Sequence, residues 1–579
     1  MMDFVSLKKN LKKPTDGFIT LRLAILGDSA TQFVGQAIKG YGIEKSINLE
    51  IFEAEFNQID RQIFDLSSEL YAFAADFVLI FQSSHKLLQK YNQTAIEARP
   101  GFAQENIDHI RQWFSILQTR TCAKVIFCNY TEEDDRVFGQ YANKVESSFI
   151  FQLRKLNFML QELAVQTNNL YICDLSTIHN TIGREKFWSA SIYINTEMVA
   201  SIDALPYFAQ AVVNIIATVQ GDFKKCIILD LDNTVWGGVI GDNGVENIQI
   251  GSLGIGKAFT EFQHWIKKLK QRGIIIAVCS KNTESIAKEP FEKHPDMVLK
   301  LSDIAVFVAN WENKVDNICK IQHILNVGFD SMVFIDDNPF ERNMVREHIP
   351  QITVPEIPVD PADYLDYLYG LNLFETDSFS AEDAGRTRQY QIDAERSVLQ
   401  ESFTNENDFL KSLNMVSNTQ PFDDFSIPRV AQLSQRSNQF NLRTVRYTVE
   451  DIKRIAQSDK YLTLSFTLED KFSDNGLICS VILEKRDAKT LFINTWFMSC
   501  RILKRGMEAY TLNSVVELAK ANGYSQIIGE YIPSPKNQLV CDHYKNLGFT
   551  SVENGFWLLE TKNYVMKNNY ITRKINSNG

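Results

Sequence analysis

The first 220 residues alternate between short apolar runs and longer segments whose apolar residues recur every three or four positions. The apolar runs are LRLAILGDS, INLEIFEAEF, ADFVLIFQSS, AKVIFCNY and NLYICDL, and the longer repeats lie in 106–118 and 149–166. Short apolar runs predict buried strands, whereas the three-to-four repeat predicts helices that cover them. This part of the chain is therefore predicted to form a largely parallel sheet with helices on its faces.

The same alternation resumes at KKCIILDLDNTVWGG and ends in the proline-rich stretch ITVPEIPVDPADY. After a charged helical segment, the runs YLTLSFTLED, LICSVILEKR and TLFINTWFMSCRI indicate successive antiparallel strands. The pattern predicts a multidomain α/β protein. Its expected parts are a parallel-sheet domain at 1–220, a second one at 221–375, a helical linker at 376–402 and a mixed α+β domain at 403–579.

Composition narrows the class of protein. Hydrophobic residues make up 45% of the 579 residues and charged residues 23%, which is typical of packed globular domains. The formal net charge of −11 disfavours non-specific binding to nucleic acid or anionic membranes. The longest apolar stretch, 207–219, is too short to span a bilayer, and the N-terminus lacks the apolar core of a secretory signal. Nine scattered cysteines without a C-x-x-C pair favour free thiols in the cytoplasm over a zinc cluster.

Polar side chains gather at the strand ends of the second domain. Each follows an apolar run or opens the next helix, and the set is Asp230, Asp232, Thr234, Ser280, Lys314, Asp336, Asp337 and Asn338. Because the carboxyl ends of parallel strands meet at one edge of a sheet, we expect these groups to converge. Clustered carboxylates repel one another and need a divalent cation or raised pKa values. Oxygen ligands without His or Cys favour Mg²⁺ over zinc.

These residues resemble the motifs of the haloacid dehalogenase (HAD) superfamily of aspartate-nucleophile phosphotransferases. Residues 230–234 match its Asp-x-Asp-x-Thr motif. The resemblance implies that Asp230 attacks phosphorus, Asp232 protonates the leaving group and then activates water, and Thr234 orients the site. Ser280 and Lys314 would hold phosphoryl oxygens. The alternative is that these are ordinary strand-end turn residues.

The same resemblance implies a metal site. Mg²⁺ would be bound by Asp230, Asp232 and Asp336, with Asp337 and Asn338 in supporting positions. The gaps between the motifs are too short for a large cap domain, so the resemblance implies an open site, suited to a macromolecular substrate or to a lid from another domain.

Longer strings narrow the resemblance to the FkbH-like proteins. They include ILDLDNTVWGGVIGDNG, VFIDDNPFER, QLSQRSNQFNLRT and GEYIPSPKN, and the likeness covers about 220 to 560. It implies an enzyme that takes D-1,3-bisphosphoglycerate, a small phosphorylated acyl substrate, removes phosphate and loads the glyceryl group onto the thiol of an acyl carrier protein.

The last domain resembles the GNAT acyltransferase fold, which grips coenzyme A at a glycine-rich helix N-terminus. Arg501, Lys504 and Gly506 occupy the corresponding segment, with lysine in place of the first glycine. Either coenzyme A or a phosphopantetheine thiol fits this expectation. Cys500 precedes these cations and is the candidate acceptor thiol, with His543 as a candidate partner. The alternative for Cys500 is an inert buried cysteine.

In the first domain, Gly27-Asp28-Ser29 follows an apolar run and resembles the nucleophile block of SGNH esterases. A serine nucleophile also needs a histidine and an orienting carboxylate. The nearest candidate, His179, follows Asp174 at a spacing two residues too long for that family. An SGNH-like binding or lid domain is therefore favoured over a working esterase.

The leading hypothesis is a Mg²⁺-dependent phosphatase fused to an acyl-transfer domain. A second is a phosphatase whose flanking domains only bind substrate or a partner, and a third is a scaffold with a vestigial site.

Overall fold

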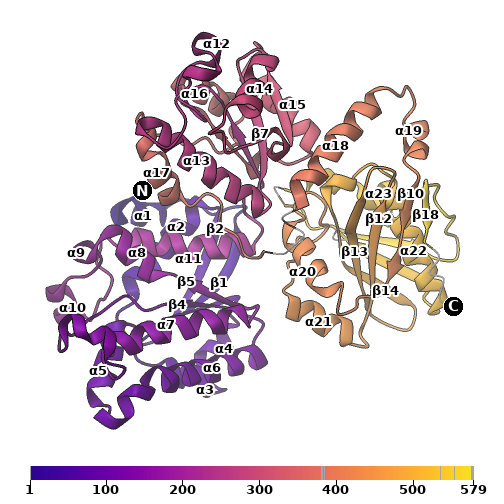
Figure 1. The fold of residues 1–579 in the computed structure, drawn as a ribbon. Helices are drawn as coiled ribbons and strands as arrows, with labels where there is room; N and C mark the ends of the chain where they lie inside the picture. Colours follow the sequence, from indigo (N-terminus) through magenta and orange to yellow (C-terminus); the bar gives the residue numbers. More distant parts are fainter. Residues whose placement is uncertain (1, 380–382, 384, 535, 553–554, 575–579) are drawn as a thin grey trace. The chain divides into compact units, whose positions relative to one another are not determined.

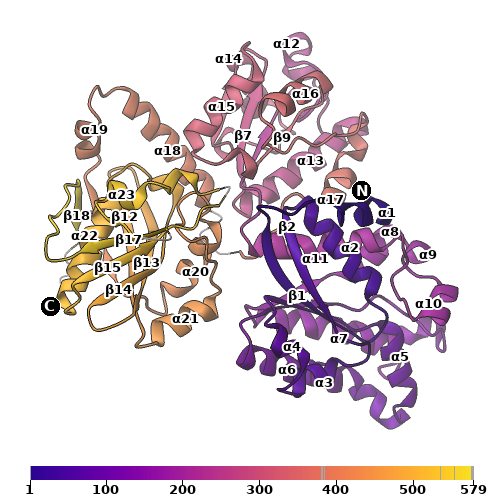
Figure 2. The same ribbon diagram turned by 180° about the vertical axis from the view of Figure 1, so that it is seen from behind.

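The computed structural model describes residues 2–379, 383, 385–534, 536–552 and 555–574. The chain divides into two compact units, unit 1 (Met1–Val219) and unit 2 (Gln220–Gly579). Figures 1 and 2 show the elements of each unit from opposite sides. Of the helices in the described residues, none combines the length and the apolar character that crossing a bilayer requires.

Unit 1 is built on a five-stranded parallel sheet in the order β2-β1-β3-β4-β5. Alternate residues of β1 enter two separate cores, Leu23 and Ile25 on one face and Ala24 and Leu26 on the other, as the pleat of a strand requires. Helices α2 and α11 cover the first face, and α6 and α7 cover the second (Figure 1). The predicted parallel sheet with helices on its faces is confirmed.

The bounds in unit 1 follow the apolar runs of the sequence. The strands are β1 (Ile19–Gly27), β2 (Ile47–Glu53), β3 (Phe77–Phe81), β4 (Lys124–Cys128) and β5 (Leu170–Cys173). The helices are α1 (Phe4–Asn10), α2 (Gln32–Glu44), α3 (Ile59–Phe64), α4 (Glu69–Phe73), α5 (Ser84–Gln93), α6 (Phe102–Arg120), α7 (Phe149–Val165), α8 (Leu175–Ile182), α9 (Arg184–Phe187), α10 (Ala190–Thr196) and α11 (Leu205–Val219).

Unit 2 begins with a four-stranded parallel sheet in the order β8-β7-β6-β9. Its strands are β6 (Cys226–Leu229), β7 (Ile275–Ser280), β8 (Val306–Ala309) and β9 (Met332–Ile335). Helix α13 packs on one face, and α15 and α16 pack on the other. The helices around this sheet are α12 (Ile240–Asn243), α13 (Gly254–Gln271), α14 (Glu284–Lys293), α15 (Lys314–Leu325), α16 (Pro339–His348) and α17 (Tyr364–Leu371).

The segment predicted as a helical linker contains α18 (Arg386–Glu401). This helix contacts α15 and β7, and its Tyr390 is buried in the core of the parallel sheet. At the other end of the segment, Arg396 of α18 pairs with Asp470, which follows a strand of the next sheet. Helix α18 is therefore packed between the two sheets of unit 2.

The second sheet of unit 2 is mixed, with the order β16-β17-β15-β14-β13-β12-β10-β18. Strands β12, β13 and β14 are antiparallel, as predicted, whereas β14 and β15 are parallel. Helix α22 packs on one face, and α20 and α21 pack on the other. A multidomain α/β chain with parallel sheets and one mixed sheet is therefore confirmed.

The strands of this sheet are β10 (Met415–Ser417), β11 (Thr419–Gln420), β12 (Tyr461–Glu469), β13 (Asp474–Lys485), β14 (Thr490–Met498), β15 (Gln526–Glu530), β16 (Thr550–Ser551), β17 (Phe556–Glu560) and β18 (Ile571–Arg573). Its helices are α19 (Glu406–Ser412), α20 (Ile427–Arg436), α21 (Val449–Gln457), α22 (Met507–Ala521) and α23 (His543–Asn546).

Candidate active site

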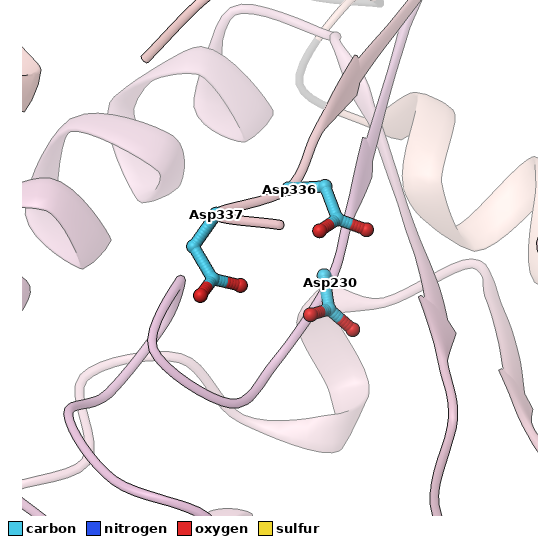
Figure 3. Close-up of side chains that lie close together, drawn as sticks. All are labelled: Asp230, Asp336 and Asp337. Carbon is cyan, nitrogen blue, oxygen red and sulfur yellow. The ribbon is translucent and has the colours of Figure 1, made fainter. Parts of the chain in front are cut away.

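Three carboxylates converge at the edge of the four-stranded sheet. Asp230 directly follows β6, and Asp336 and Asp337 follow β9. Strands β6 and β9 are hydrogen-bonded neighbours whose last residues, Leu229 and Ile335, lie opposite each other. Carboxylate oxygens of the three residues therefore lie within 4.8 Å of one another, and Figure 3 shows them facing a shared space.

Lys314, at the start of α15, supplies the positive charge. Its Nζ lies 3.0 Å from Oδ1 of Asp230 and also hydrogen-bonds Oδ2 of Asp336. Burial by itself would lower the pKa of Lys314, but the two carboxylates outweigh burial and raise it. The lysine therefore stays protonated and offsets part of the negative charge.

One cation does not neutralise three carboxylates, of which Asp230 and Asp336 are buried and Asp337 is half-buried. Burial, and then the nearby charge of Asp230, raise the pKa of Asp336 and Asp337. Asp336 is fully buried. The group offers oxygen ligands only, and such a set fits a hard divalent cation such as Mg²⁺ rather than zinc. Asp230, Asp336 and Asp337 are the residues that could hold it.

The carboxylate of Asp232 is not in this group, although it was predicted as a metal ligand. Its Oδ1 accepts hydrogen bonds from the Trp236 indole N–H at 2.9 Å and from the Ile240 backbone N–H at 3.0 Å. Its Oδ2 accepts one from the Asn282 amide at 3.0 Å. Burial, partly opposed by these bonds, raises the pKa of Asp232. The third member of the carboxylate group is therefore Asp337, not Asp232 as predicted.

The other predicted residues lie at the same edge. Thr234 is fully buried, and its hydroxyl accepts the backbone N–H of Asp337 at 3.1 Å. The Asn338 backbone N–H donates to Oδ1 of Asp336 at 2.8 Å, while its side chain caps α16. Ser280 is buried as the last residue of β7. The loops after β6 and β9 are thus bonded to each other.

Sequence reasoning missed the residues that hold these loops. Arg342, buried in α16, donates to the backbone carbonyls of Asp336 at 2.8 Å and Asp337 at 2.7 Å. Trp236 and Asn282 orient Asp232 as described above. Arg342 and Trp236 lie within the strings that carry the FkbH-like resemblance, so those strings could have identified them.

Cys500 lies in a different part of unit 2, two residues beyond β14. The thiol residue is half-buried, and its backbone carbonyl accepts the Asn326 side-chain amide at 2.6 Å. The three cationic side chains that follow Cys500 in the sequence have different surroundings. Arg501 contacts Gln389 and Tyr390, Lys504 is exposed with a φ of 63°, and the Arg505 guanidinium pairs with Asp393 and Asp470. Gly506, with a φ of 81°, caps the N-terminus of α22.

His543 is packed among aromatic rings. The ring centroids of Trp496 and Phe440 lie 4.5 Å and 4.9 Å from that of His543. Burial lowers the pKa of His543 to about 3, so the imidazole is neutral. In the described residues its Nε2 has no hydrogen-bond partner. The structure therefore gives His543 an aromatic environment in place of the predicted pairing with Cys500.

In unit 1, Asp28 and Ser29 follow β1 and are buried. The Asp28 carboxylate accepts the backbone N–H of Ser83 at 2.8 Å. His179 lies in α8 with its ring against Phe187, and among the described residues no hydrogen bond joins it to Ser29. Asp174, the expected orienting carboxylate, caps α8 and accepts the Asn129 amide. These contacts are structural.

Comparisons with known proteins agree with this architecture. Residues 22–217 match the family model described as FkbH, N-terminal domain. Among solved structures, the N-terminal part of a Bacteroides fragilis protein, which contains a phosphatase domain and is complexed with Mg, shares 56% sequence identity. The match covers 66% of this chain and 100% of that chain, with a TM-score of 0.63. No curated protein matches the chain.

The chain therefore belongs to the same family as this Bacteroides fragilis protein, and its residues 22–217 belong to the FkbH N-terminal domain family. Shorter matches also occur. The ribosomal-protein-S18-alanine N-acetyltransferase of Escherichia coli is 13% identical over 25% of this chain and 94% of that chain, with a TM-score of 0.20. Another is a putative acetyltransferase of Salmonella typhimurium with acetyl-CoA, 10% identical over 26% of this chain and 96% of that chain, also with a TM-score of 0.20.

Proposed function

We propose that this protein is a Mg²⁺-dependent phosphatase of the HAD type, with Asp230 as the nucleophile. The observation that carries the proposal is the group of Asp230, Asp336 and Asp337 at the carboxyl ends of parallel strands, in which the buried Asp230 and Asp336 pair with Lys314. The relative that is 56% identical contains a phosphatase domain and is complexed with Mg. Its likeness supports both the reaction class and the metal.

The proposed reaction has two steps. In the first, a carboxylate oxygen of Asp230 attacks phosphorus, the bond to the leaving oxygen breaks, and Asp232 gives that oxygen a proton. In the second, Asp232 takes a proton from water, the water oxygen attacks phosphorus, and the bond to Asp230 breaks to release phosphate. Its raised pKa suits Asp232 to the donor role.

Lys314 holds a phosphoryl oxygen as negative charge moves onto it, with the backbone and hydroxyl groups of the same loops. Asp230, Asp336 and Asp337 would hold Mg²⁺, which supplies charge stabilisation for the phosphoryl oxygens when it is bound. Arg342 keeps the Asp336 and Asp337 loop in place through two carbonyl contacts.

The proposal extends to acyl transfer. In an acyl phosphate such as D-1,3-bisphosphoglycerate, the thiolate of Cys500 attacks the carbonyl carbon, a C–S bond forms, and the bond to the phosphate oxygen breaks. The thiol proton goes to solvent and phosphate leaves. Exchange with the thiol of an acyl carrier protein then frees Cys500. The FkbH-like family and the half-buried thiol support this step.

Phosphate release from small phosphate esters, with and without Mg²⁺, tests the phosphatase. Asp230→Asn should lower the rate by at least about a thousandfold, because it removes the nucleophile. Asp242→Asn, which changes an exposed carboxylate in the short helix α12, is the matched control and should not lower it. Equal rates for the two variants would refute Asp230 as the nucleophile.

Intact mass spectrometry with D-1,3-bisphosphoglycerate tests acyl transfer. A glyceryl adduct that disappears in Cys500→Ser and moves to an added carrier protein is the expected result. Phosphate release without an adduct would leave a phosphatase whose remaining domains only bind.

A further inference from the structure

Unit 2 contains a small cavity that is separate from the three carboxylates. It is lined by groups from four parts of the chain: the residue before β6, helix α18, helix α20 with the residue that follows it, and the turn after β14. The charged groups and the thiol in its wall are Lys225, Arg386, Arg429, Arg436, Arg501 and Cys500. Five cations thus surround one small space.

Among the described residues, salt bridges neutralise only part of the positive charge around this cavity. Asp383 is fully buried and bonds both Arg386 and Arg436. Within the described residues, Lys225 and Arg501 make no salt bridge. The Lys225 ammonium donates to the backbone carbonyl of Arg436 at 2.8 Å, and Arg501 contacts the neutral side chain of Gln389.

Repulsion between these cations also disfavours their protonated forms. Burial lowers the pKa of Lys225 to about 8; the nearby Cys500 and Asp330 oppose this shift, and Arg386 adds to it. Burial, followed by Arg436, lowers the pKa of Arg386 to about 9. A bound anion would relieve this repulsion, because opposite charge favours the protonated forms.

Two buried polar atoms in the wall point to a ligand independently of charge. Among the described residues, the hydroxyl of Ser437 and Nε of Arg436 have no hydrogen-bond partner. Ser437 is 5% exposed and lines the cavity. A buried polar atom without a partner costs free energy unless a ligand or solvent bonds it.

The cavity lies at the other end of β6 from the carboxylates. Lys225 precedes this strand and Asp230 follows it. At about 3.3 Å per residue, their Cα atoms lie about 16 Å apart. An anion in the cavity therefore does not touch the phosphatase site, and its binding is independent of the phosphatase reaction.

We propose that this basic cavity is a second phosphoryl-binding site, which holds the phosphoryl group of a small ligand beside the thiol of Cys500. Guanidinium groups bind phosphoryl oxygens through paired N–H donors, and several of them enclosing a small space match a dianion. The phosphoryl group can belong to a small phosphorylated acyl compound or to the phosphopantetheine part of coenzyme A.

Protection of Cys500 from alkylation tests the proposal on the full-length protein. Iodoacetamide labelling is followed at each cysteine by peptide mass spectrometry while inorganic phosphate is titrated at constant ionic strength with chloride. The exposed thiols of Cys122, Cys319 and Cys541 are internal controls. Saturable slowing at Cys500 alone is expected. Equal slowing at the exposed thiols, or no slowing at Cys500, would overturn the proposal.

Two variants test whether the phosphate that protects Cys500 binds in this cavity. Arg501→Gln and Arg429→Gln should each raise the half-protecting phosphate concentration about tenfold, because each removes a charged donor. Arg486→Gln, which removes an exposed guanidinium stacked on Phe492 in the same sheet, should leave it unchanged. Three equal effects would indicate non-specific ion screening and would refute the site.

The ligand's source is distinguished by a second titration. Desulfo-coenzyme A has no thiol that could consume iodoacetamide. Protection at concentrations well below those of phosphate would assign the site to a pantetheine-linked phosphate. Protection by acetyl phosphate and phosphate but not by desulfo-coenzyme A would assign it to a small acyl phosphate. Asp230→Asn keeps the protection in both cases, so failure of the phosphatase proposal would not affect this result.

Discussion

Asp28 and Asp230 occupy equivalent positions in two different parallel sheets. Each directly follows a buried strand, β1 or β6, and each is almost fully buried. Asp230 meets Lys314 at 3.0 Å and lies beside two further carboxylates. Asp28 accepts the N–H of Ser83, and among the described residues its Oδ1 has no hydrogen-bond partner. A carboxylate at a strand end becomes a candidate catalytic group only where neighbouring strand ends bring it charged partners.

The largest expected difference is in the rate of phosphate release after replacement of the lysine near each aspartate. Lys314→Met should lower phosphate release by about a hundredfold to a thousandfold, because it removes the positive charge that holds a phosphoryl oxygen. Lys86→Met in unit 1, whose lysine pairs with Glu197 at 2.7 Å, should change the rate less than about twofold. Steady-state phosphate release measures both. Similar losses in the two variants would remove the distinction between the sites.

A smaller effect is expected on stability. Burial raises the pKa of Asp28 from 3.8 to about 7. Because the folded state then binds a proton more tightly than the unfolded state, this group stabilises unit 1 at low pH, and the contribution is lost as pH rises from about 4 through 7. Asp28→Asn should remove that loss and raise the free energy of unfolding of unit 1 at pH 8 by a few kcal/mol.

Pulse proteolysis of the full chain in urea, with peptides of unit 1 quantified, measures this change at pH 5 and pH 8. Asp203→Asn, which changes an exposed carboxylate of unit 1, is the control. A variant as sensitive to pH as the natural protein would show that Asp28 does not titrate in this range.

The smallest effect concerns the orientation of Asp232. Trp236→Phe keeps an aromatic ring in the core but removes the indole N–H that bonds Oδ1 at 2.9 Å. Phosphate release should fall about tenfold, because one of three donors that position the acid is lost. The loss of a hydrogen bond to the carboxylate should also raise the pKa of Asp232 and shift the basic limb of the pH–rate profile, where this acid loses its proton, to higher pH. A fall in rate with an unmoved profile would indicate a structural effect only.

The sequence predicts the strands and their ends well, because buried parallel strands are short apolar runs and polar residues directly follow them. Asp230, Asp336 and Lys314 could be placed at one edge for this reason. The direction of a side chain within a loop could not be predicted. The carboxylate of Asp232 bonds Trp236 and Asn282, whereas the carboxylate of Asp337 lies beside Asp230. The direction of Asp232 thus depends in part on Asn282, which lies 50 positions away in the sequence.

Sequence proximity was also misleading after β14. Arg505 follows Cys500 closely, yet its charge is paired with Asp393 and Asp470. The cations that line the cavity with Cys500 include Lys225, which lies 275 positions earlier in the chain. No local pattern brings these segments together, because their meeting depends on how two sheets and α18 pack.

The contacts of Lys314 have a consequence for the order in which ligands bind. When ionised, three carboxylates and one ammonium carry a total of two negative charges. In this state the site repels a phosphoryl dianion, whereas a divalent cation brings the total to zero. We therefore expect the metal to bind before the substrate, and in a chelator the affinity of the protein for a phosphate ester at this edge of the sheet should fall.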